Sequence, residues 1–176
     1  MKRWFRVQQI GIVSRPDDPG GNDCEFFDPF VESVIEIDPR WKSGLTGIEE
    51  FSHLVVLFYL DRAQRRRASG PLRAAEDGPM QSLVGFFSTR TPKRPNPLGI
   101  ACPRLVSREG RRLTVIGMDA WDGTPVIDIK GYYPRDELRS DAAVPTWLSE
   151  LWNKHDLERA SDLHTVDGGK TTQTED

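Results

Sequence analysis

The sequence predicts a mainly β protein, a small closed or nearly closed β barrel with short helices and a C-terminal helix. Three observations lead to this prediction. The chain of 176 residues contains 13 prolines and 15 glycines, which favour strands and turns over long helices. Short stretches that are apolar, or that alternate between apolar and polar residues, follow one another with turn formers between them. A single segment near the C-terminus has the periodicity of an amphipathic helix.

The expected strands extend along the chain as far as Tyr132. They are Trp4–Val13, Val31–Ile37, Leu54–Leu60, Val84–Phe87, Ile100–Val106, Arg112–Met118 and Val126–Tyr132. Leu54–Leu60 reads LVVLFYL and is apolar throughout, as expected of a strand that is buried on both faces. The segment DDPGGND, at Asp17–Asp23, is rich in turn formers and is expected to be a loop.

The expected helix covers Pro145–Ala160, with Leu148, Leu151, Trp152 and His155 on one face. Pro145 suits the first position of a helix, because its fixed φ is helical and its missing N–H is not needed there. The predicted organisation is a β-barrel domain over residues 1–140, a helical extension over 141–160 and a disordered polar tail over 161–176.

The net charge of −3 argues against a protein that binds nucleic acid over its whole surface, but a local basic patch remains compatible with it. The segment DRAQRRR, with Arg62 and Arg65–Arg67, is such a patch. Cys24 and Cys102 lie far apart and have no metal-ligand spacing. No stretch resembles a signal peptide or is long enough to cross a bilayer. We therefore expect a soluble, cytoplasmic protein.

The segment STRTPKRPNPLG, at Ser88–Gly99, combines rigidity with positive charge. Its prolines fix φ and hold the residues before them in extended conformations, so Asn96 lies between two rigid positions. A preorganised loop binds a ligand at a lower entropic cost. Arg90 and Arg94 can present planar donor groups to a carboxylate or a phosphate. We interpret the segment as one side of a ligand site; a rigid loop with solvated arginines is the alternative.

The segment MDAWDGTPVIDIK, which starts at Met118, carries charged residues around a turn and along the strand after it. Asp119 and Asp122 flank the turn, and Asp122 followed by glycine is also an ordinary hairpin signal. Asp128 and Lys130 are two residues apart on a strand, which places both side chains on the same face. They are either site residues at the interior or mouth of the barrel or an exposed salt bridge.

Three segments in this order, GIEEFSHLVVLFYL, GFFSTRTPKRPNPLGI and GMDAWDGTPVIDIKGYYP, resemble the TsaA-like (YaeB/TrmO) family. The resemblance covers about residues 5–140, and the runs TR-x-P-x-RPNP-x-G and DGTPV-x-DIK carry it. The better-known members are S-adenosylmethionine-dependent methyltransferases. They methylate N6 of N6-threonylcarbamoyladenosine at tRNA position 37. The resemblance implies a small β barrel, a homodimer and S-adenosylmethionine as the cofactor.

The resemblance also implies the residues that contact the cofactor. The family positions match Asp61, Arg62, Arg90, Ile100, Asp119, Ala120, Trp121 and Asp122. Two departures from the family pattern accompany them. Asp61-Arg62 stands where some bacterial members have His-Gln, and DDPGGNDCEF stands where many relatives have Pro-Arg-Gln.

The implied reaction requires an acceptor nitrogen that has lost its proton and lies in line with the S–CH3 bond. We expect Asp122 or Asp128 to take the proton, Arg94 or Lys130 to bind the threonyl carboxylate and Asn96 to orient the base. The arginines at 65–67 would bind tRNA phosphates. Two alternatives remain open: a methyltransferase that acts on another substrate, and a non-catalytic module that binds S-adenosylmethionine.

Overall fold

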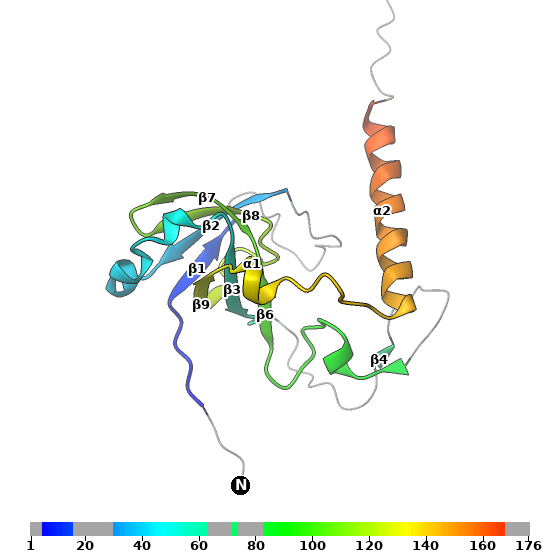
Figure 1. Ribbon diagram of the computed structural model, residues 1–176, viewed down its shortest axis with the longest axis horizontal. Helices are drawn as coiled ribbons and strands as arrows, with labels where there is room; N and C mark the ends of the chain where they lie inside the picture. The colour runs from blue at the N-terminus through cyan, green and yellow to red at the C-terminus, as the bar shows by residue number, and fades with distance from the viewer. Residues whose placement is uncertain (1–4, 16–29, 63–71, 74–82, 168–176) are drawn as a thin grey trace, which may run out of the picture. The chain divides into compact units, whose positions relative to one another are not determined.

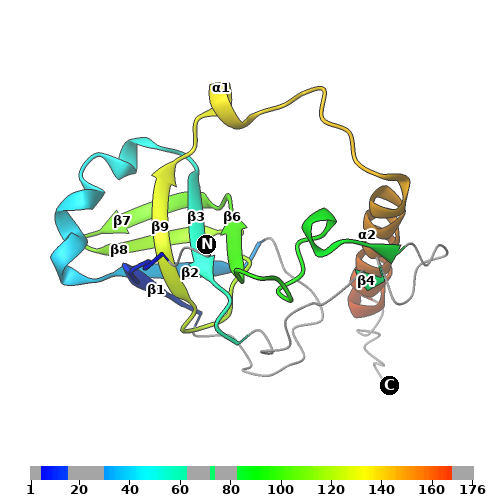
Figure 2. The same cartoon turned by 90° about the horizontal axis from the view of Figure 1, so that it is seen from below.

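A computed structural model of the protein describes residues 5–15, 30–62, 72–73 and 83–167. Its main feature is a seven-stranded antiparallel sheet with the strand order β6-β3-β9-β1-β2-β8-β7 (Figure 1, Figure 2). The strands are β1 (Gly11–Ser14), β2 (Glu32–Ile37), β3 (Leu54–Tyr59), β6 (Leu98–Ala101), β7 (Arg104–Glu109), β8 (Arg112–Ile116) and β9 (Pro125–Gly131). The prediction of a mainly β fold is confirmed.

The chain divides into two compact units. The first comprises Met1–Arg67 and Arg90–Leu138 and contains the whole seven-stranded sheet. It also contains the short helices η1 (Pro39–Leu45), η2 (Ile48–Glu50) and α1 (Pro134–Glu137). The second unit comprises Ala68–Thr89 and Arg139–Asp176. Its elements are the two-stranded sheet of β4 (Leu72–Arg73) and β5 (Leu83–Val84), the short helix η3 (Phe86–Ser88) and α2 (Thr146–Asp167).

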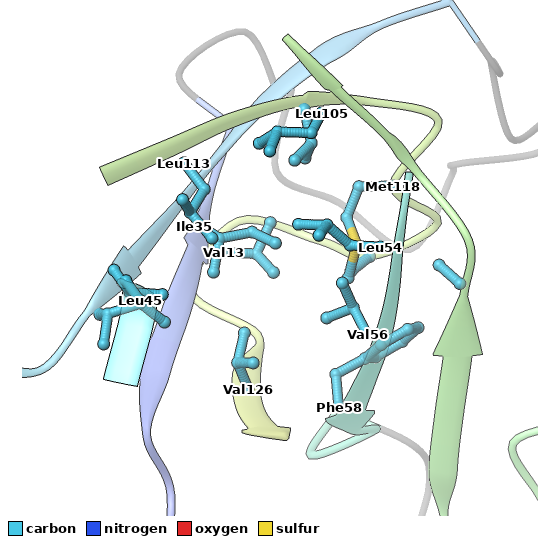
Figure 3. Close-up of a cluster of buried hydrophobic side chains, with 14 residues drawn as sticks. Val13, Ile35, Leu45, Leu54, Val56, Phe58, Leu105, Leu113, Met118 and Val126 are labelled. Carbon is cyan, nitrogen blue, oxygen red and sulfur yellow. The ribbon is translucent and has the colours of Figure 1, made fainter. Parts of the chain in front are cut away.

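The hydrophobic core lies on one face of the seven-stranded sheet, where alternate side chains of its strands meet (Figure 3). Val13, Ile35, Val56, Leu113 and Val126 come from different strands and have no exposed surface. Burying one side chain of this size contributes about 1.5–3 kcal/mol to folding. The expectation that Leu54–Leu60 is buried on both faces holds for its first part, because Leu54, Val55 and Val56 are all buried.

The closed barrel is supported only loosely, because β6 and β7 form the two edges of an open sheet. One isolated bridge, between His53 and Arg104, joins the start of β7 to the residue before β3. Two backbone hydrogen bonds accompany it: the Leu54 amide donates to the Pro103 carbonyl (3.0 Å), and the Leu105 amide donates to the Ser52 carbonyl (2.8 Å). The described sheet is therefore curved, with a short contact between its ends.

Two expected strands are wrong in part. The stretch expected at Trp4–Val13 forms a strand only from Gly11, since its earlier described residues have no continuous partner strand and leave Phe5 and Val7 exposed. The stretch expected at Val84–Phe87 leaves the strand after Val84 and turns into η3, because the Ser88 amide donates to the Gly85 carbonyl (2.9 Å).

The strand expected at Ile100–Val106 is two strands, β6 and β7. They are separated by Cys102 and Pro103, and proline has no N–H to continue a ladder. The chain changes partners at this point, since β6 pairs with β3 while β7 pairs with β8. Hydrophobic alternation alone does not reveal such a change of partner.

The predicted C-terminal helix is confirmed as α2, which begins one residue later and continues to Asp167. The Pro145 carbonyl accepts a hydrogen bond from the Leu148 amide (3.0 Å), as expected at the start of a helix. On its predicted apolar face, Leu148, Leu151 and His155 are partly buried, whereas Trp152 is half exposed. The disordered tail predicted over 161–176 is wrong in its first part, because α2 continues through these residues as far as Asp167. The remainder of the expected tail lies outside the described residues, as do Cys24 and the loop at Asp17–Asp23.

Gly99 of β6 provides a test of the packing between β6 and β3. It lies opposite Phe58, and a Cβ at this position would overlap with the Phe58 ring, which is only 2% exposed and has no room to move. We expect Gly99→Ala to lower the free energy of unfolding by about 1–3 kcal/mol through overpacking, measured by urea denaturation.

Gly44→Ala is the matched control, because a Cβ at Gly44 has no heavy atom within 4 Å. The double variant Gly99→Ala/Phe58→Leu should recover part of the lost stability, since the smaller side chain leaves room for the new methyl group. Equal stability of Gly99→Ala and the wild type would show that this contact does not constrain β6.

Candidate functional site

Several predicted site residues lie at one end of the strands of the seven-stranded sheet, and not along an edge strand. β1 and β3 are both antiparallel to β9, so both finish at the end of the sheet where β9 begins. β6 is antiparallel to β3 and also begins there. The segments that meet here are Ser14–Arg15 at the end of β1, Asp61–Arg62 after β3 and Asp119–Thr124 before β9. We call them the site edge.

The turn at Trp121–Thr124 is held against β1 by backbone hydrogen bonds. The Gly123 amide donates to the Val13 carbonyl (2.8 Å), and the Val13 amide donates to the Thr124 carbonyl (2.9 Å). The Thr124 amide closes the turn by donating to the Trp121 carbonyl (3.2 Å). Gly123 has φ of 78°, a left-handed conformation that glycine adopts without strain. The Asp-Gly pair therefore forms the turn that the sequence predicts.

Arg62 connects the end of β3 to this turn. Its Nη2 donates to the Asp122 carbonyl (2.7 Å), and its guanidinium lies 5.6 Å from the centroid of the Trp121 ring. A cation over an aromatic face at this distance is stabilised by the ring quadrupole, by about 0.5–1 kcal/mol at an exposed site. The structure thus brings together Asp61-Arg62 and Trp121-Asp122, which the resemblance assigns to the same ligand.

Arg15 is a site-edge residue that the sequence analysis missed. Its backbone amide donates to Asp122 Oδ1 (2.8 Å), and its Nη1 donates to the Ala120 carbonyl (3.3 Å). Its Nε is buried and has no hydrogen-bond partner. The only signal in the sequence was an arginine two residues after the predicted strand Trp4–Val13 and directly before Pro16.

Asp119 lies between the buried residues Met118 and Ala120 and carries an unusual pKa. Surrounding protein raises the pKa of Asp119 by desolvation, although the side chain still has access to solvent. The positive charges of Arg15 and Arg90 oppose this rise by favouring the carboxylate. The structure therefore places Arg90, a predicted cofactor contact, near enough to Asp119 to affect its charge.

The proline segment joins the site edge through its last residues. The Leu60 amide donates to the Pro97 carbonyl (2.8 Å), which fixes the end of the segment beside Asp61. The Arg94 amide donates to the Pro92 carbonyl (2.9 Å), a tight local turn. Asn96 is exposed and Arg94 is partly buried.

Asp128 and Lys130 form an ion pair with each other on the outer face of the sheet, opposite the core. A bulge between Leu57 and Phe58 places Val126 and Ile129 against the core, so Asp128 and Lys130 point away from it. The shared face is confirmed, and the two residues form the exposed salt bridge that the sequence analysis gave as one alternative. Their role at a site at the mouth of the barrel stays a prediction.

Ile100 also faces outward, with 51% of its surface exposed on the edge strand β6. The basic residues at 65–67 lie outside the described residues. Among the residues that the structure describes, no helix is long and apolar enough to cross a membrane.

The fold and the site edge together define a small antiparallel β-sheet protein with arginine, aspartate and tryptophan side chains gathered at one edge. Such a set suits a polar, charged ligand that also has an aromatic group. Residues 25–137 match the model of the tRNA-methyltransferase O N-terminal domain. The chain belongs to this family.

Known proteins agree with this assignment. The chain is 38% identical over 130 residues to an S-adenosyl-L-methionine-binding protein of Archaeoglobus fulgidus, covering 73% of this chain and 89% of that protein. It is 38% identical over 98 residues to the mouse (Mus musculus) tRNA (adenine(37)-N6)-methyltransferase, covering 51% of this chain and 20% of the enzyme. The crystal structure of TrmO from Pseudomonas aeruginosa matches with a TM-score of 0.61 and 28% identity, covering 82% of this chain and 63% of that one. The chain thus spans less than two thirds of the solved TrmO chain.

The raised pKa of Asp119 predicts how this residue affects stability. Because its folded-state pKa lies above the ordinary aspartate pKa of 3.8, its ionisation costs stability as the pH rises through the raised pKa. We expect Asp119→Asn to unfold at a higher urea concentration than the wild type at pH 7. The difference should disappear below pH 3.8, where both folded and unfolded Asp119 are protonated.

Asp38→Asn is the control with the opposite sign. Hydrogen bonds from the Arg40 backbone and side chain lower the pKa of Asp38, so its ionisation favours folding. This variant should be less stable than the wild type at pH 7. A loss of stability in Asp119→Asn at pH 7 would contradict the assigned environment of Asp119.

Proposed function

We propose that the protein is an S-adenosylmethionine-dependent methyltransferase that acts on N6 of N6-threonylcarbamoyladenosine at tRNA position 37. The observation that carries the proposal is the convergence of Asp61, Arg62 and Asp119–Asp122 at one sheet edge. These are the positions that the family resemblance assigns to the cofactor. They come from segments far apart in the sequence, and the Arg62 side chain joins them directly.

The residues of the site edge fit the chemistry of S-adenosylmethionine. The cofactor carries an adenine, a sulfonium and an amino acid group with both charges. Trp121 offers an aromatic ring, Asp61 and Asp119 offer negative charge, and the buried Nε of Arg15 is a donor that still needs an acceptor. A site with these groups can hold each part of the cofactor.

The bound cofactor would supply an electrophilic methyl group on sulfur. The protein's own contribution is to hold the acceptor nitrogen in line with that bond and to receive the proton that leaves it. The rigid turns of the proline segment and of Trp121–Thr124 suit this role, since both are fixed by backbone hydrogen bonds before a ligand binds.

Of the two carboxylates expected to take the proton, Asp122 is better placed. It belongs to the site edge, and its Oδ1 is positioned by the Arg15 amide. Asp128 is paired with Lys130 on the outer face, where a bound proton would disrupt that ion pair. We therefore assign the proton to Asp122, and the threonyl carboxylate to Arg94 rather than to Lys130. We assign to Asn96 the role of orienting the base through hydrogen bonds to its edge.

A second candidate is a module that binds S-adenosylmethionine without methylating RNA. The observation in its favour is the Archaeoglobus fulgidus relative, which this chain covers almost completely and which is named only as an S-adenosyl-L-methionine-binding protein. A methyltransferase with another acceptor is the third candidate. Methyl transfer to tRNA distinguishes the proposed enzyme from the other two candidates.

The proposed cofactor site is tested by calorimetric titration of S-adenosylmethionine. We expect Arg62→Ala to weaken binding about tenfold, because it removes both the contact with Trp121 and the hydrogen bond to the Asp122 carbonyl. Arg40→Ala is the matched control, since Arg40 also lies over a tryptophan, Trp41, but follows β2 at the opposite edge of the sheet. Equal loss in both variants, or no binding by the wild type, would refute the site.

The acceptor is tested by incubating the protein and methyl-labelled S-adenosylmethionine with two tRNAs that differ only in the threonylcarbamoyl group at position 37. Label on the modified tRNA alone supports the proposal. Binding of the cofactor with no label on either tRNA supports the module or another acceptor.

In the proposed enzyme, the basic residues at 65–67 bind tRNA phosphates, so neutralising them should reduce the salt dependence of tRNA binding.

We also propose that the protein acts as a homodimer in the cytoplasm. Tyr59, Leu98 and Ile100 form an exposed apolar patch on the outer face of β3 and its edge neighbour β6. Covering such a patch with a second copy would protect both apolar surface and an open sheet edge.

Light scattering should give twice the chain mass of 20.0 kDa, and Leu98→Lys should give the monomer. Val106→Lys, on the edge strand β7, is the control that should stay dimeric.

A further inference from the structure

We propose that Arg15 and Asp119 together recognise a zwitterionic α-amino acid group, Arg15 binding its carboxylate and Asp119 its ammonium. The ligand group would be the methionyl end of S-adenosylmethionine, so the inference rests on the proposed function. It adds a residue, Arg15, that the family resemblance did not supply, and it gives Asp119 a specific partner.

Only some of the N–H groups of the Arg15 guanidinium donate hydrogen bonds within the protein. Its position is fixed by its own amide, which donates to Asp122 Oδ1 (2.8 Å), and by Nη1, which donates to the Ala120 carbonyl (3.3 Å). Nε remains without a partner although it is buried. A buried donor with no acceptor costs about 1–3 kcal/mol. Because Nε has almost no accessible surface, the proposed binding requires the atoms that cover it to move, after which the ligand acceptor recovers that cost.

The guanidinium edge that includes Nε suits a carboxylate better than other acceptors. Nε and Nη2 present two parallel N–H groups, which match the two oxygens of a carboxylate. A carbonyl oxygen would satisfy only one of them. The unused donor therefore favours an anion with two acceptor oxygens, such as a carboxylate.

Asp119 supplies the opposite charge a few residues along the site edge. Its backbone is fixed between two buried residues, Met118 and Ala120, and Ala120 is also the residue whose carbonyl anchors Arg15. The charges of Arg15 and Asp119 affect each other, yet within the described part of the chain no ion pair joins them. Since Arg15 and Asp119 are not paired with each other, each can pair with the oppositely charged group of a zwitterionic ligand.

The pair discriminates between the two carboxylates of the proposed reaction. The nitrogen of the threonyl group in N6-threonylcarbamoyladenosine is acylated and carries no positive charge, so it offers Asp119 a neutral N–H but no ion pair. The methionyl group has both a carboxylate and an ammonium. A site that contains both Arg15 and Asp119 therefore favours the cofactor over the acceptor.

The test is calorimetric titration of three ligands: S-adenosylmethionine, its decarboxylated analogue and its desamino analogue. We expect the wild type to prefer S-adenosylmethionine over each analogue by about tenfold or more, the usual effect of a hydrogen bond to a charged group. Arg15→Gln should bring the preference over the decarboxylated analogue close to one. Asp119→Asn should do the same for the desamino analogue.

Each ratio is measured on one protein sample, so partial unfolding of a variant cancels. Arg15→Lys adds a second check, because it keeps the charge but loses the paired donors and should retain only part of the preference. Arg40→Gln, at the opposite edge, should leave both ratios unchanged.

Unchanged ratios in Arg15→Gln and Asp119→Asn, with S-adenosylmethionine still bound, would overturn the inference and leave the proposed function intact. If Arg15→Gln instead weakens only the binding of the nucleoside N6-threonylcarbamoyladenosine relative to its methyl ester, the carboxylate belongs to the acceptor and the zwitterion assignment is wrong. If the wild type binds none of the three cofactor ligands, the proposed function fails, and this inference fails with it.

Discussion

The site depends on the attachment of the Trp121–Thr124 turn to β1. The two hydrogen bonds between Val13 and this turn continue the pairing of β1 with β9, so the turn has the same rigidity as the sheet. Val13 and Val126 lie in the core on either side of that pairing and have no exposed surface. The position of Asp122 and of its contacts with Arg15 and Arg62 therefore follows from core packing. A site built in this way requires little ordering when a ligand binds.

The same edge contains groups that a core selected for stability alone would exclude. The Nε of Arg15 is buried without a partner, and desolvation raises the pKa of Asp119. Both features cost folding free energy, which the buried strands offset. Their concentration beside one turn is typical of a functional site, where unmet hydrogen bonds and shifted charges are retained because a ligand satisfies them. Ser33 Oγ, the other buried side-chain atom without a partner in the described residues, lies in β2.

The sequence predicted the strands well where hydrophobic pattern and turn chemistry agree. Asp122-Gly123 forms its turn as expected because only glycine adopts the required φ without strain. The pattern failed where partners change, since Ile100–Val106 is apolar enough for one strand but pairs with two different neighbours on either side of Pro103. It also left open which face of the sheet carries Asp128, because a bulge in the pairing with β3 shifts the alternation. A bulge depends on the partner strand and leaves no local signal.

The site was predicted through family motifs more than through local chemistry, and Arg15 shows the limit of that approach. The residue lies outside the matched region of 25–137, at the end of a strand where an arginine has no distinctive pattern. Its role becomes visible only when the pairing of β1 with β9 brings it beside Ala120 and Asp122, more than a hundred positions later in the chain. Long-range pairing of this kind is set by the whole sheet, which a reading of successive segments does not give.

Binding of the cofactor and recognition of the acceptor have different support, because the relatives overlap with this chain to different extents. The Archaeoglobus fulgidus protein, named for cofactor binding, is covered over 89% of its length, whereas the mouse tRNA enzyme is covered over only 20%. Binding of S-adenosylmethionine is thus a property expected of the shared domain, while recognition of RNA can use parts that the relatives do not share. In this chain, α2 and residues 139–145 lie outside the matched region. Within that region, the arginines and lysine of the proline segment are the described cations that continue directly from the site edge, through the bond between Pro97 and Leu60. If the acceptor is an RNA, its modified nucleoside is therefore expected beside the proline segment, which agrees with the assignment of the threonyl carboxylate to Arg94.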